Sequence, residues 1–138
     1  MTRRSILDLV AEAKTEIAEL SVAELQAELA AGSATVIDIR DIRERIEMGA
    51  IPGSVSAPRG MLEFWFDPDS PYHRDTYHFD KRYVFYCAGG LRSALATKAI
   101  QDLGFTDVAH LEPGFAGWRE AGAEIDDVAA TSKWIKRG

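Results

Sequence analysis

The chain has a single cysteine, and the residues that follow it have the types and spacing for nucleophilic chemistry. They read Cys87-Ala-Gly-Gly-Leu-Arg92-Ser93, directly after a run of aromatic and β-branched residues that is typical of a buried strand. Two glycines permit a sharp turn, and the amides of such a turn, with those at the start of a helix, bind anions. The same amides stabilise a thiolate. We therefore predict a reactive Cys87 beside an anion site.

The residues beside the glycines extend this prediction. Arg92 comes five positions after the cysteine and is able to reach back as a forked ligand for an anion. Ser93 either caps the helix or bonds to the sulfur. We predict that Cys87 and Arg92 are catalytic. We predict that the rest of the loop binds substrate, together with Arg59, which follows Ala57-Pro58. For Arg59, an ordinary surface position is an equally good explanation. The predicted substrate-binding residues are Ala88, Gly89, Gly90, Leu91, Ser93 and Arg59.

The spacing between cysteine and arginine separates two chemistries. Four residues lie between Cys87 and Arg92. This is one fewer than in the loops of protein-tyrosine phosphatases, and Tyr86 stands where those loops usually have histidine. A smaller ring of amides fits a tetrahedral phosphate poorly but fits one sulfur atom added to the cysteine. The spacing therefore favours sulfur transfer through a Cys87 persulfide over phosphate chemistry.

Strands and helices must position this loop. Runs of β-branched and aromatic residues predict strands at 35–39, 82–87 and 108–111, with a brief extended piece before residue 58. Apolar stripes and capping residues predict helices at 4–20, 21–32, 43–48, 91–103 and 114–120, and a last turn or helix with Trp134 and Ile135. This alternation predicts an α/β domain with a mostly parallel sheet. Ligands of such sheets bind at the carboxyl ends of the strands, where Asp38, Arg40 and Cys87 fall.

Residues 60–80 form a long connection with many aromatic residues and turn signals. We interpret Phe64-Trp65-Phe66 as a satellite of the core, with a substrate platform as the alternative. His73 and His78 lie in this connection, but their spacing fits no standard metal site. We therefore predict no metal.

Four ordered pieces of the chain carry a resemblance to a known family. They are Val36-Ile-Asp-Ile-Arg40 with Glu44, Gly49-Ala-Ile-Pro-Gly-Ser54 with Ala57-Pro58, the loop from Cys87 to Ser93, and Leu111-Glu-Pro-Gly114 with Gly117-Trp118 and Gly122. In this order and spacing they resemble the rhodanese homology domain in its single-domain form. The resemblance implies a five-stranded, mostly parallel sheet flanked by helices on both faces, to which this chain adds an N-terminal helix. It also implies a sulfurtransferase that needs no metal or organic cofactor.

The resemblance further implies a ping-pong reaction. The cysteine takes sulfane sulfur from thiosulfate, a persulfide or a polysulfide, and passes it to cyanide, a thiol or a protein acceptor. Asp38 and Arg40 match the family's Asp-x-Arg pair, which we interpret as a structural ion pair near the site, with pocket shaping as the alternative. Residues 88–90 are small and neutral, where efficient thiosulfate enzymes often carry Arg or Lys. We therefore expect weak activity with thiosulfate and a different best donor.

Length and composition set the remaining expectations. The 138 residues form one domain, which we divide into an N-terminal helical extension (1–20), a rhodanese-like domain (21–126) and a C-terminal tail or short helix (127–138). The net charge of −6 argues against a nucleic-acid partner. No apolar run approaches the ~20 residues of a membrane span, and no secretory signal region is evident, so we predict a cytoplasmic protein. One cysteine excludes an internal disulfide. We expect a monomer or a homodimer.

Two other functions stay open on the sequence alone. The first is a non-catalytic sulfur carrier or redox-sensing interaction module, in which Cys87 holds sulfur or is oxidised without turnover. The second is a phosphatase or arsenate-type enzyme on the same fold, which the loop spacing disfavours.

Overall fold

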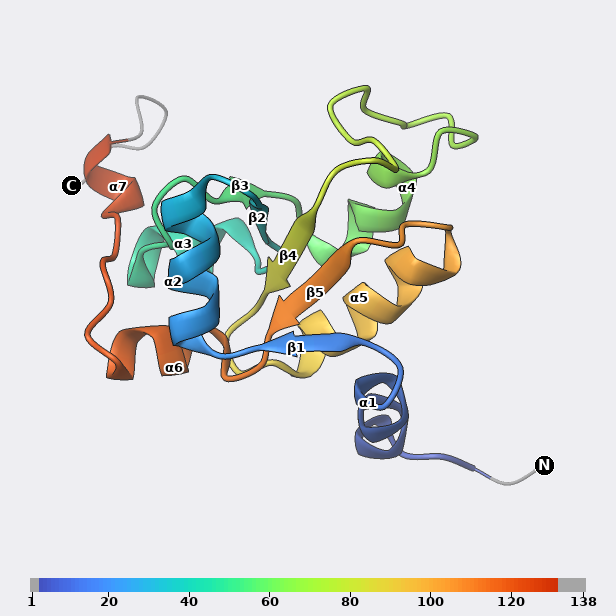
Figure 1. Cartoon of the computed structure of the whole chain (residues 1–138), viewed down its shortest axis with the longest axis horizontal. Coiled ribbons are helices and arrows are strands. Elements are labelled where there is room, and N and C mark those ends of the chain that lie inside the picture. Colours follow the sequence, from blue (N-terminus) through green and yellow to red (C-terminus); the bar gives the residue numbers. More distant parts are fainter. Residues whose placement is uncertain (1–2, 132–138) are drawn as a thin grey trace.

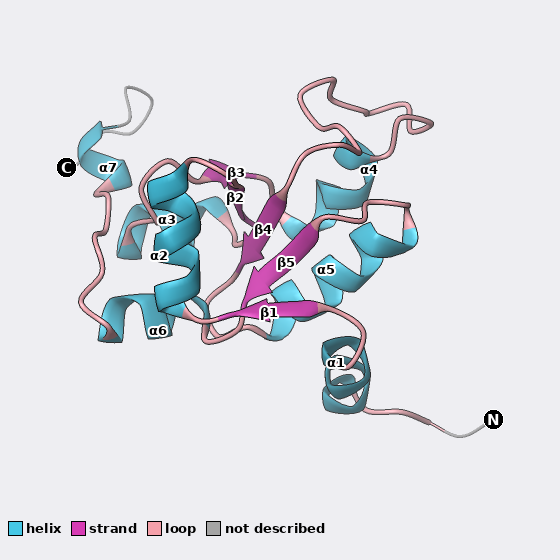
Figure 2. Cartoon of the chain, viewed as in Figure 1, coloured by secondary structure: helices cyan, strands magenta, loops and turns pink. Residues whose placement is uncertain are grey.

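A sheet of five parallel strands forms the centre of the protein (Figures 1 and 2). The computed structural model describes residues 3–131. The strands occur in the order β1-β5-β4-β2-β3. Their bounds are Ala18–Leu20 (β1), Thr35–Asp38 (β2), Val55–Ser56 (β3), Tyr83–Tyr86 (β4) and Val108–Leu111 (β5). The predicted fold class is confirmed, and the carboxyl ends of β2, β4 and β5 meet at one edge of the sheet.

Helices cover both faces of the sheet (Figure 2). Side chains of β2 and β4 point alternately to the two faces, so Ile37 and Phe85 enter one core and Val36 and Val84 the other. The first core includes residues of α4 and α5, and the second includes residues of α2 and α6. The helices are α1 (Ile6–Lys14), α2 (Val22–Ala31), α3 (Ile42–Met48), α4 (Leu62–Phe66), α5 (Leu91–Asp102), α6 (Gly114–Glu120) and α7 (Val128–Thr131), with a short 3-10 helix at Arg59–Met61.

The predicted limits of α2 are confirmed by its two ends. Ser21 and Glu24 form the expected capping box, in which each side chain accepts a hydrogen bond from the other residue's backbone N–H. Gly32 follows the helix in the left-handed conformation, with φ of 67°. Both ends of this helix are therefore marked by signals that lie in the neighbouring residues of the sequence.

The predicted helix over residues 4–20 is wrong in its last part. Helix α1 ends at Lys14, and Ala18–Leu20 form the edge strand β1, which pairs in parallel with β5. Backbone groups along the free edge of β5 need partners, and pairing with β1 supplies them. Ile17 and Leu20 suit a helical stripe and a short strand equally well, so the sequence pattern does not separate the two.

The connection at 60–80 begins with a helix that the sequence analysis did not separate from the loop. Phe66 on α4 is fully buried and stacks on Tyr77, with ring centroids 4.1 Å apart. Trp65 packs against the same core and lies under the guanidinium of Arg74. The interpretation of this aromatic cluster as a satellite of the core is confirmed for these two rings, whereas Phe64 is half exposed. The predicted turn at Trp134 and Ile135 lies outside the described residues.

Candidate active site

Cys87 directly follows β4, and its sulfur lies inside the turn that starts α5. The backbone N–H groups of Gly90 and Ser93 donate to Cys87 Sγ, at 3.2 Å and 3.3 Å. The residue is 1% exposed. The predicted strand-to-helix loop is confirmed, and two amide donors face the atom on which a negative charge would form.

The first turn of α6 fixes the outer side of this loop. The N–H of Phe115 donates to the carbonyl oxygen of Cys87 at 2.8 Å, and the N–H of Ala116 donates to that of Ala88 at 3.0 Å. Both loop carbonyls therefore point toward α6 and away from the sulfur. This arrangement removes two negative ends of peptide dipoles from the site and satisfies amides at the start of α6.

Two glycines make the contact between the loop and α6 possible. Gly90 has φ of 91°, and a Cβ atom there would lie 2.1 Å from the carbonyl oxygen of Glu112. Gly114 has φ of 67°, and a Cβ atom there would lie 2.5 Å from the carbonyl oxygen of Ala88. Any other residue at either position would have to move the backbone. Gly89, by contrast, has open room around it.

A line of polar side chains leads away from the sulfur on the α5 face. Cys87 Sγ lies 3.4 Å from Ser93 Oγ, and Ser93 Oγ lies 2.8 Å from His110 Nδ1. His110 Nε2 lies 2.9 Å from a carboxylate oxygen of Glu19 on β1. The alternative that Ser93 bonds to the sulfur is therefore confirmed. We call Ser93, His110 and Glu19 the His110 network.

His110 was not among the predicted site residues. An imidazole within a buried apolar strand needs hydrogen-bond partners, and this was the signal available. Burial lowers the pKa of His110, and the charges of Glu19 and Glu112 oppose this effect only in part, whereas that of Lys14 adds to it. The imidazole is therefore neutral at neutral pH.

A second polar cluster lies on the α6 face, at the end of β2. Asp38 accepts two hydrogen bonds from the Arg40 guanidinium, at 3.0 Å and 2.8 Å, and one each from Arg45 and the Tyr86 hydroxyl. The Arg40 guanidinium also lies 4.4 Å from the ring centre of Phe115. We call Asp38, Arg40, Arg45 and Tyr86 the Asp38 network. The structure agrees with the interpretation of Asp38 and Arg40 as a buried ion pair that braces the site.

The protonation of the Asp38 network follows from its partners. Burial acts to raise the pKa of Asp38, but the hydrogen bonds and charge of Arg40 outweigh it and leave the pKa below its usual range. Burial and the neighbouring Asp38 charge raise the pKa of Tyr86 to about 12. Asp38 is therefore ionised and Tyr86 neutral at physiological pH.

Comparison with known proteins identifies the family to which the chain belongs. The family model of the rhodanese-like domain matches residues 21–121. The chain belongs to the rhodanese-like domain family. The putative sulfurtransferase YtwF of Bacillus subtilis is 35% identical over 104 residues, which are 75% of this chain and 91% of that protein.

Two solved structures show the same fold. The human single-domain sulfurtransferase TSTD1 is 29% identical, with a TM-score of 0.64 over 74% of this chain and 95% of that one. A protein of unknown function from Rhodopseudomonas palustris, described as a possible tyrosine phosphatase, is 49% identical. It has a TM-score of 0.86 over 91% of this chain and 97% of its own.

In this rhodanese-like domain, the side chain of Arg92 is already paired. Its guanidinium forms a forked ion pair with Glu44 of α3, at 2.9 Å and 3.1 Å. The forked contact predicted for a bound anion is thus made with a carboxylate of the chain. That contact, more than the charge of Cys87, raises the pKa of Arg92. Arg92 and Leu91 are both exposed at the start of α5.

The other predicted binding residue, Arg59, begins the 3-10 helix after β3, which lies two strands away from β4, the strand before Cys87. Its backbone N–H donates to the Ile39 carbonyl at 3.1 Å, and its side chain pairs with Glu63. The guanidinium is partly exposed. Its role as a guide for anions stays a prediction.

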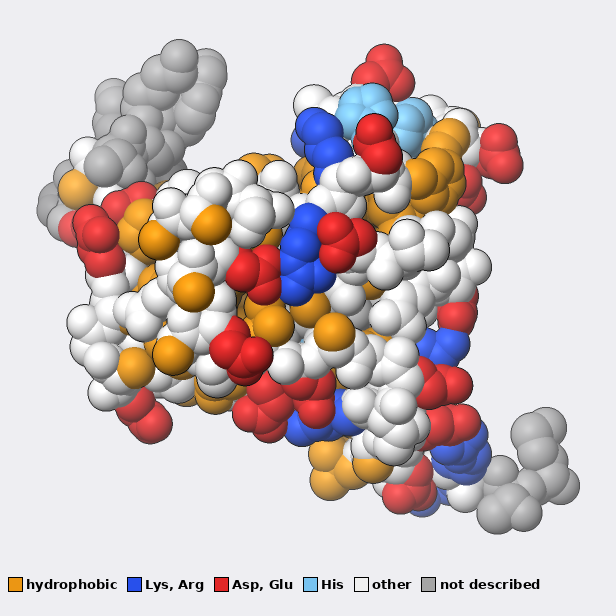
Figure 3. Space-filling model, viewed as in Figure 1, with side chains coloured by type: hydrophobic (Ala, Val, Ile, Leu, Met, Phe, Trp, Pro, Cys, Tyr) orange, Lys and Arg blue, Asp and Glu red, His pale blue; other side chains and the backbone are white. Residues whose placement is uncertain are grey.

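Three further observations concern metal binding, membrane insertion and nucleic-acid binding. Within residues 3–131, no group of three or more His, Cys, Asp or Glu side chains is placed to hold a metal ion. None of the described helices is long and apolar enough to cross a membrane. Figure 3 shows basic side chains mixed with acidic ones on the face that it draws. The predicted absence of a nucleic-acid partner stays a prediction.

Proposed function

We propose that this rhodanese-like protein is a sulfurtransferase in which Cys87 carries sulfane sulfur as a persulfide. The observation that supports this most directly is the pair of amides, from Gly90 and Ser93, that donate to Cys87 Sγ. Family membership and relatives named as sulfurtransferases give the same reaction class.

The reaction would proceed in two displacements. The Cys87 thiolate attacks the outer sulfur of the donor, a new S–S bond forms, and the donor's own S–S bond breaks with its electron pair leaving on a thiolate or on sulfite. The loop amides then hold the anionic outer sulfur of the persulfide. A nucleophilic acceptor, either a thiolate or cyanide, attacks that sulfur, and the Cys87 thiolate leaves. Electrons balance in both steps, so no metal or organic cofactor is needed.

The charge around the loop argues for a donor other than thiosulfate. Thiosulfate carries two negative charges, while residues 88–90 are neutral and the Arg92 guanidinium is already paired with Glu44. We therefore propose a persulfide or polysulfide as the preferred donor and only weak activity with thiosulfate. With one cysteine in the chain, the sulfur passes to an external thiol or protein acceptor.

A phosphatase is the competing enzyme, because the Rhodopseudomonas palustris relative is described as a possible tyrosine phosphatase. The count of four residues between Cys87 and Arg92 argues against it. A carrier or sensor that holds sulfur without turnover is the competing binding function. The sulfurtransferase, the phosphatase and the carrier differ in whether sulfur bound to Cys87 is transferred and in whether phosphate esters are hydrolysed.

Intact-protein mass spectrometry tests the proposal. After incubation with glutathione persulfide, polysulfide or thiosulfate, we expect a gain of one sulfur atom, about 32 Da. The gain should be lost on addition of cyanide or thiol and be absent in Cys87→Ser. A protein that gains no sulfur from any donor would overturn the proposal. Sulfur that loads but never transfers would support the carrier, and Cys87-dependent hydrolysis of an aryl phosphate would support the phosphatase.

A further inference from the structure

The His110 network joins the buried Cys87 sulfur to the protein surface. Cys87 is 1% exposed, and both Ser93 and His110 are fully buried. The Glu19 side chain, at the far end, is 29% exposed. Parallel pairing of β1 with β5 sets Glu19 opposite His110, so the edge strand itself brings the carboxylate to the imidazole. Glu19 precedes residue 21, the first residue that matches the family model.

The direction of each hydrogen bond follows from the charges. Glu19 is a carboxylate and accepts, so His110 Nε2 carries the proton and donates to it at 2.9 Å. Nδ1 of the neutral imidazole is then an acceptor, and the Ser93 hydroxyl donates to it at 2.8 Å. This leaves a lone pair of Ser93 Oγ for the Cys87 S–H, which donates at 3.4 Å. Every bond in the line points from the thiol toward the surface.

Cys87 needs such a line of hydrogen bonds because few other groups near its sulfur are able to accept its proton. The Gly90 and Ser93 amides that contact the sulfur are donors and cannot accept a proton. Among the described residues, Ser93 is the one whose side chain accepts a hydrogen bond from Cys87 Sγ. A sulfur that is almost entirely covered also has little contact with water.

We propose that Ser93, His110 and Glu19 act as a proton relay that takes the proton of Cys87 and makes its thiolate available. This inference rests on the proposed role of Cys87 as the nucleophile. The S–H proton moves to Ser93 Oγ as the Ser93 proton moves to His110 Nδ1, which leaves a thiolate and an imidazolium. The imidazolium then releases its Nε2 proton to the Glu19 carboxylate, and from there the proton passes to water. Ser93 contacts the reacting sulfur of Cys87 and is therefore a catalytic residue. His110 and Glu19 act through Ser93 and are positioning residues.

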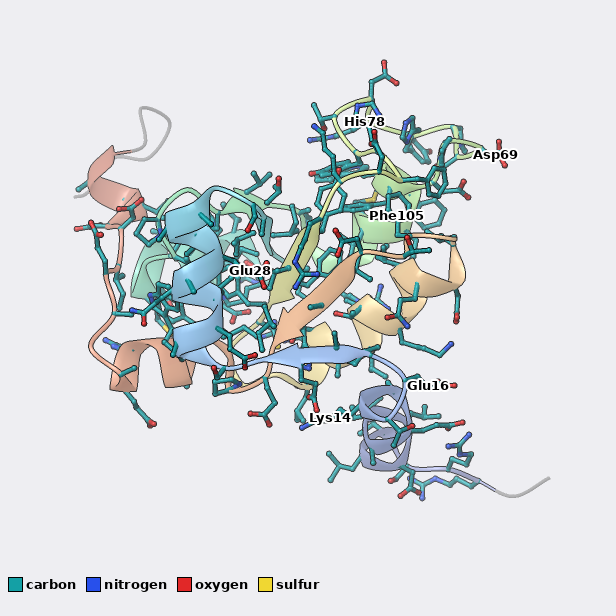
Figure 4. The ribbon with its side chains drawn as sticks, in the orientation of Figure 1. Lys14, Glu16, Glu28, Asp69, His78 and Phe105 are labelled. Carbon is teal, nitrogen blue, oxygen red and sulfur yellow. The ribbon has the colours of Figure 1, made fainter. Side chains whose placement is uncertain are left out.

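The charged groups around His110 set the pH range of the relay. Glu19 on β1 and Glu112 after β5 favour the imidazolium, whereas Lys14 at the end of α1 opposes it. Lys14 Nζ lies 3.5 Å from Glu19 and 3.1 Å from Glu112, so it also holds these two carboxylates in place. Lys14 lies beside β1, near the turn from α1 (Figure 4). The relay works only where His110 is neutral and Glu19 is ionised.

Glu19→Gln separates a relay from a purely structural contact. Glutamine keeps the size of the side chain and an oxygen that accepts from His110, but it has no charge with which to stabilise the imidazolium. The matched control is Glu16→Gln, which changes a nearby surface carboxylate (Figure 4) that pairs with Lys98. Cys87 is the single thiol, so its rate of alkylation by iodoacetamide as a function of pH reports on this atom alone.

We expect Glu19→Gln to lower the alkylation rate at pH 7 by about tenfold and to move the midpoint of the pH profile up by about one unit. Ser93→Ala should lower the rate by at least as much. The double variant Glu19→Gln/Ser93→Ala should react no more slowly than Ser93→Ala alone. Without the Ser93 hydroxyl the proton no longer reaches His110, so loss of the Glu19 charge has no additional effect. Glu16→Gln should match the original protein.

An unchanged pH profile in Glu19→Gln, or losses that add in the double variant, would overturn the relay, even if both variants unfold at lower temperature. The assay contains no sulfur donor, so its result is independent of sulfur transfer. Sulfur loading with an unchanged profile would reject the relay and keep the sulfurtransferase. A shifted pH profile without sulfur loading would keep the relay and reject the sulfurtransferase.

Discussion

The Asp38 network and the His110 network lie on opposite faces of the sheet, and both reach the Cys87 loop. In the first, one carboxylate accepts five hydrogen bonds from two arginines and a tyrosine, one of them from the Arg40 backbone N–H, so its charge is fixed over a wide pH range. In the second, a neutral imidazole has one hydrogen-bond partner on each nitrogen. The many bonds of the first suit a brace that never changes charge. The single bonds of the second suit a group that gains and loses a proton.

The largest effect that this contrast predicts is on stability, in Asp38→Ala. Removal of the carboxylate leaves the Arg40 charge buried without its partner, which costs about 3–5 kcal/mol of unfolding free energy. Urea denaturation followed by circular dichroism measures it. Asp41→Asn is the control, because Asp41 is an exposed helix cap and asparagine also caps helices. A loss in Asp38→Ala no larger than in Asp41→Asn would show that the Asp38 network is not a brace.

The next effect concerns the loop between the two networks. In Gly90→Ala, the left-handed conformation costs about 1–2 kcal/mol, and the overlap with the Glu112 carbonyl oxygen costs about 1–3 kcal/mol more. We also expect slower alkylation of Cys87, because the Gly90 amide is one of its two donors. Gly89→Ala is the matched control, since its added methyl group meets no atom within 4 Å. Equal stability of the two variants would mean that the loop is not held against residue 112.

A smaller effect separates the two networks by pH. The pKa of His110 is lowered in the folded state, mainly by burial, so its contribution to stability is present above the unfolded value of 6.5. This contribution is lost as the pH falls below 6.5 toward the folded value. The pKa of Asp38 is also lowered, but its contribution is lost only as the pH falls below the ordinary value of 3.8. Between pH 7 and 5 the unfolding free energy should therefore fall by at most about 1.4 kcal/mol per pH unit because of His110.

Urea denaturation at a series of pH values checks this. His110→Gln should remove the slope between pH 7 and 5, whereas His78→Gln should keep it. His78 lies in the exposed loop after α4, far from β1 (Figure 4). A slope that survives in His110→Gln would assign the titration to another group.

The sequence predicted the features that depend on local signals. The capping box at Ser21 and Glu24, the strand before Cys87 and the glycine turn after it each need only a few neighbouring residues, and all are confirmed. For Ser93 the sequence left two alternatives, a helix cap or a bond to the sulfur, and the structure shows the second.

The features that were missed depend on pairing between distant segments. Glu19 reaches His110 only because β1 pairs with β5, and the sequence analysis interpreted β1 as the end of a helix. The forked contact of Arg92 was predicted for an anion, but the partner is Glu44, 48 residues earlier in the chain. A residue pattern shows that a histidine or an arginine needs a partner, whereas only the register of the sheet shows which residue that partner is.

The smallest expected effect concerns the Arg92–Glu44 pair, which differs from the buried Asp38–Arg40 pair because both of its side chains are partly exposed. In Glu44→Gln the unfolding free energy should change by about 0–1 kcal/mol, as for other surface ion pairs, and glutamine can keep the capping-box bond to Asp41. The freed guanidinium would then be available to a doubly charged donor. We expect the rate of sulfur loading from thiosulfate to rise severalfold relative to loading from glutathione persulfide, measured by intact mass over time. An unchanged ratio of the two rates would mean that Glu44 does not limit the access of Arg92 to the donor, and that the neutral residues at 88–90 account for the weak activity expected with thiosulfate.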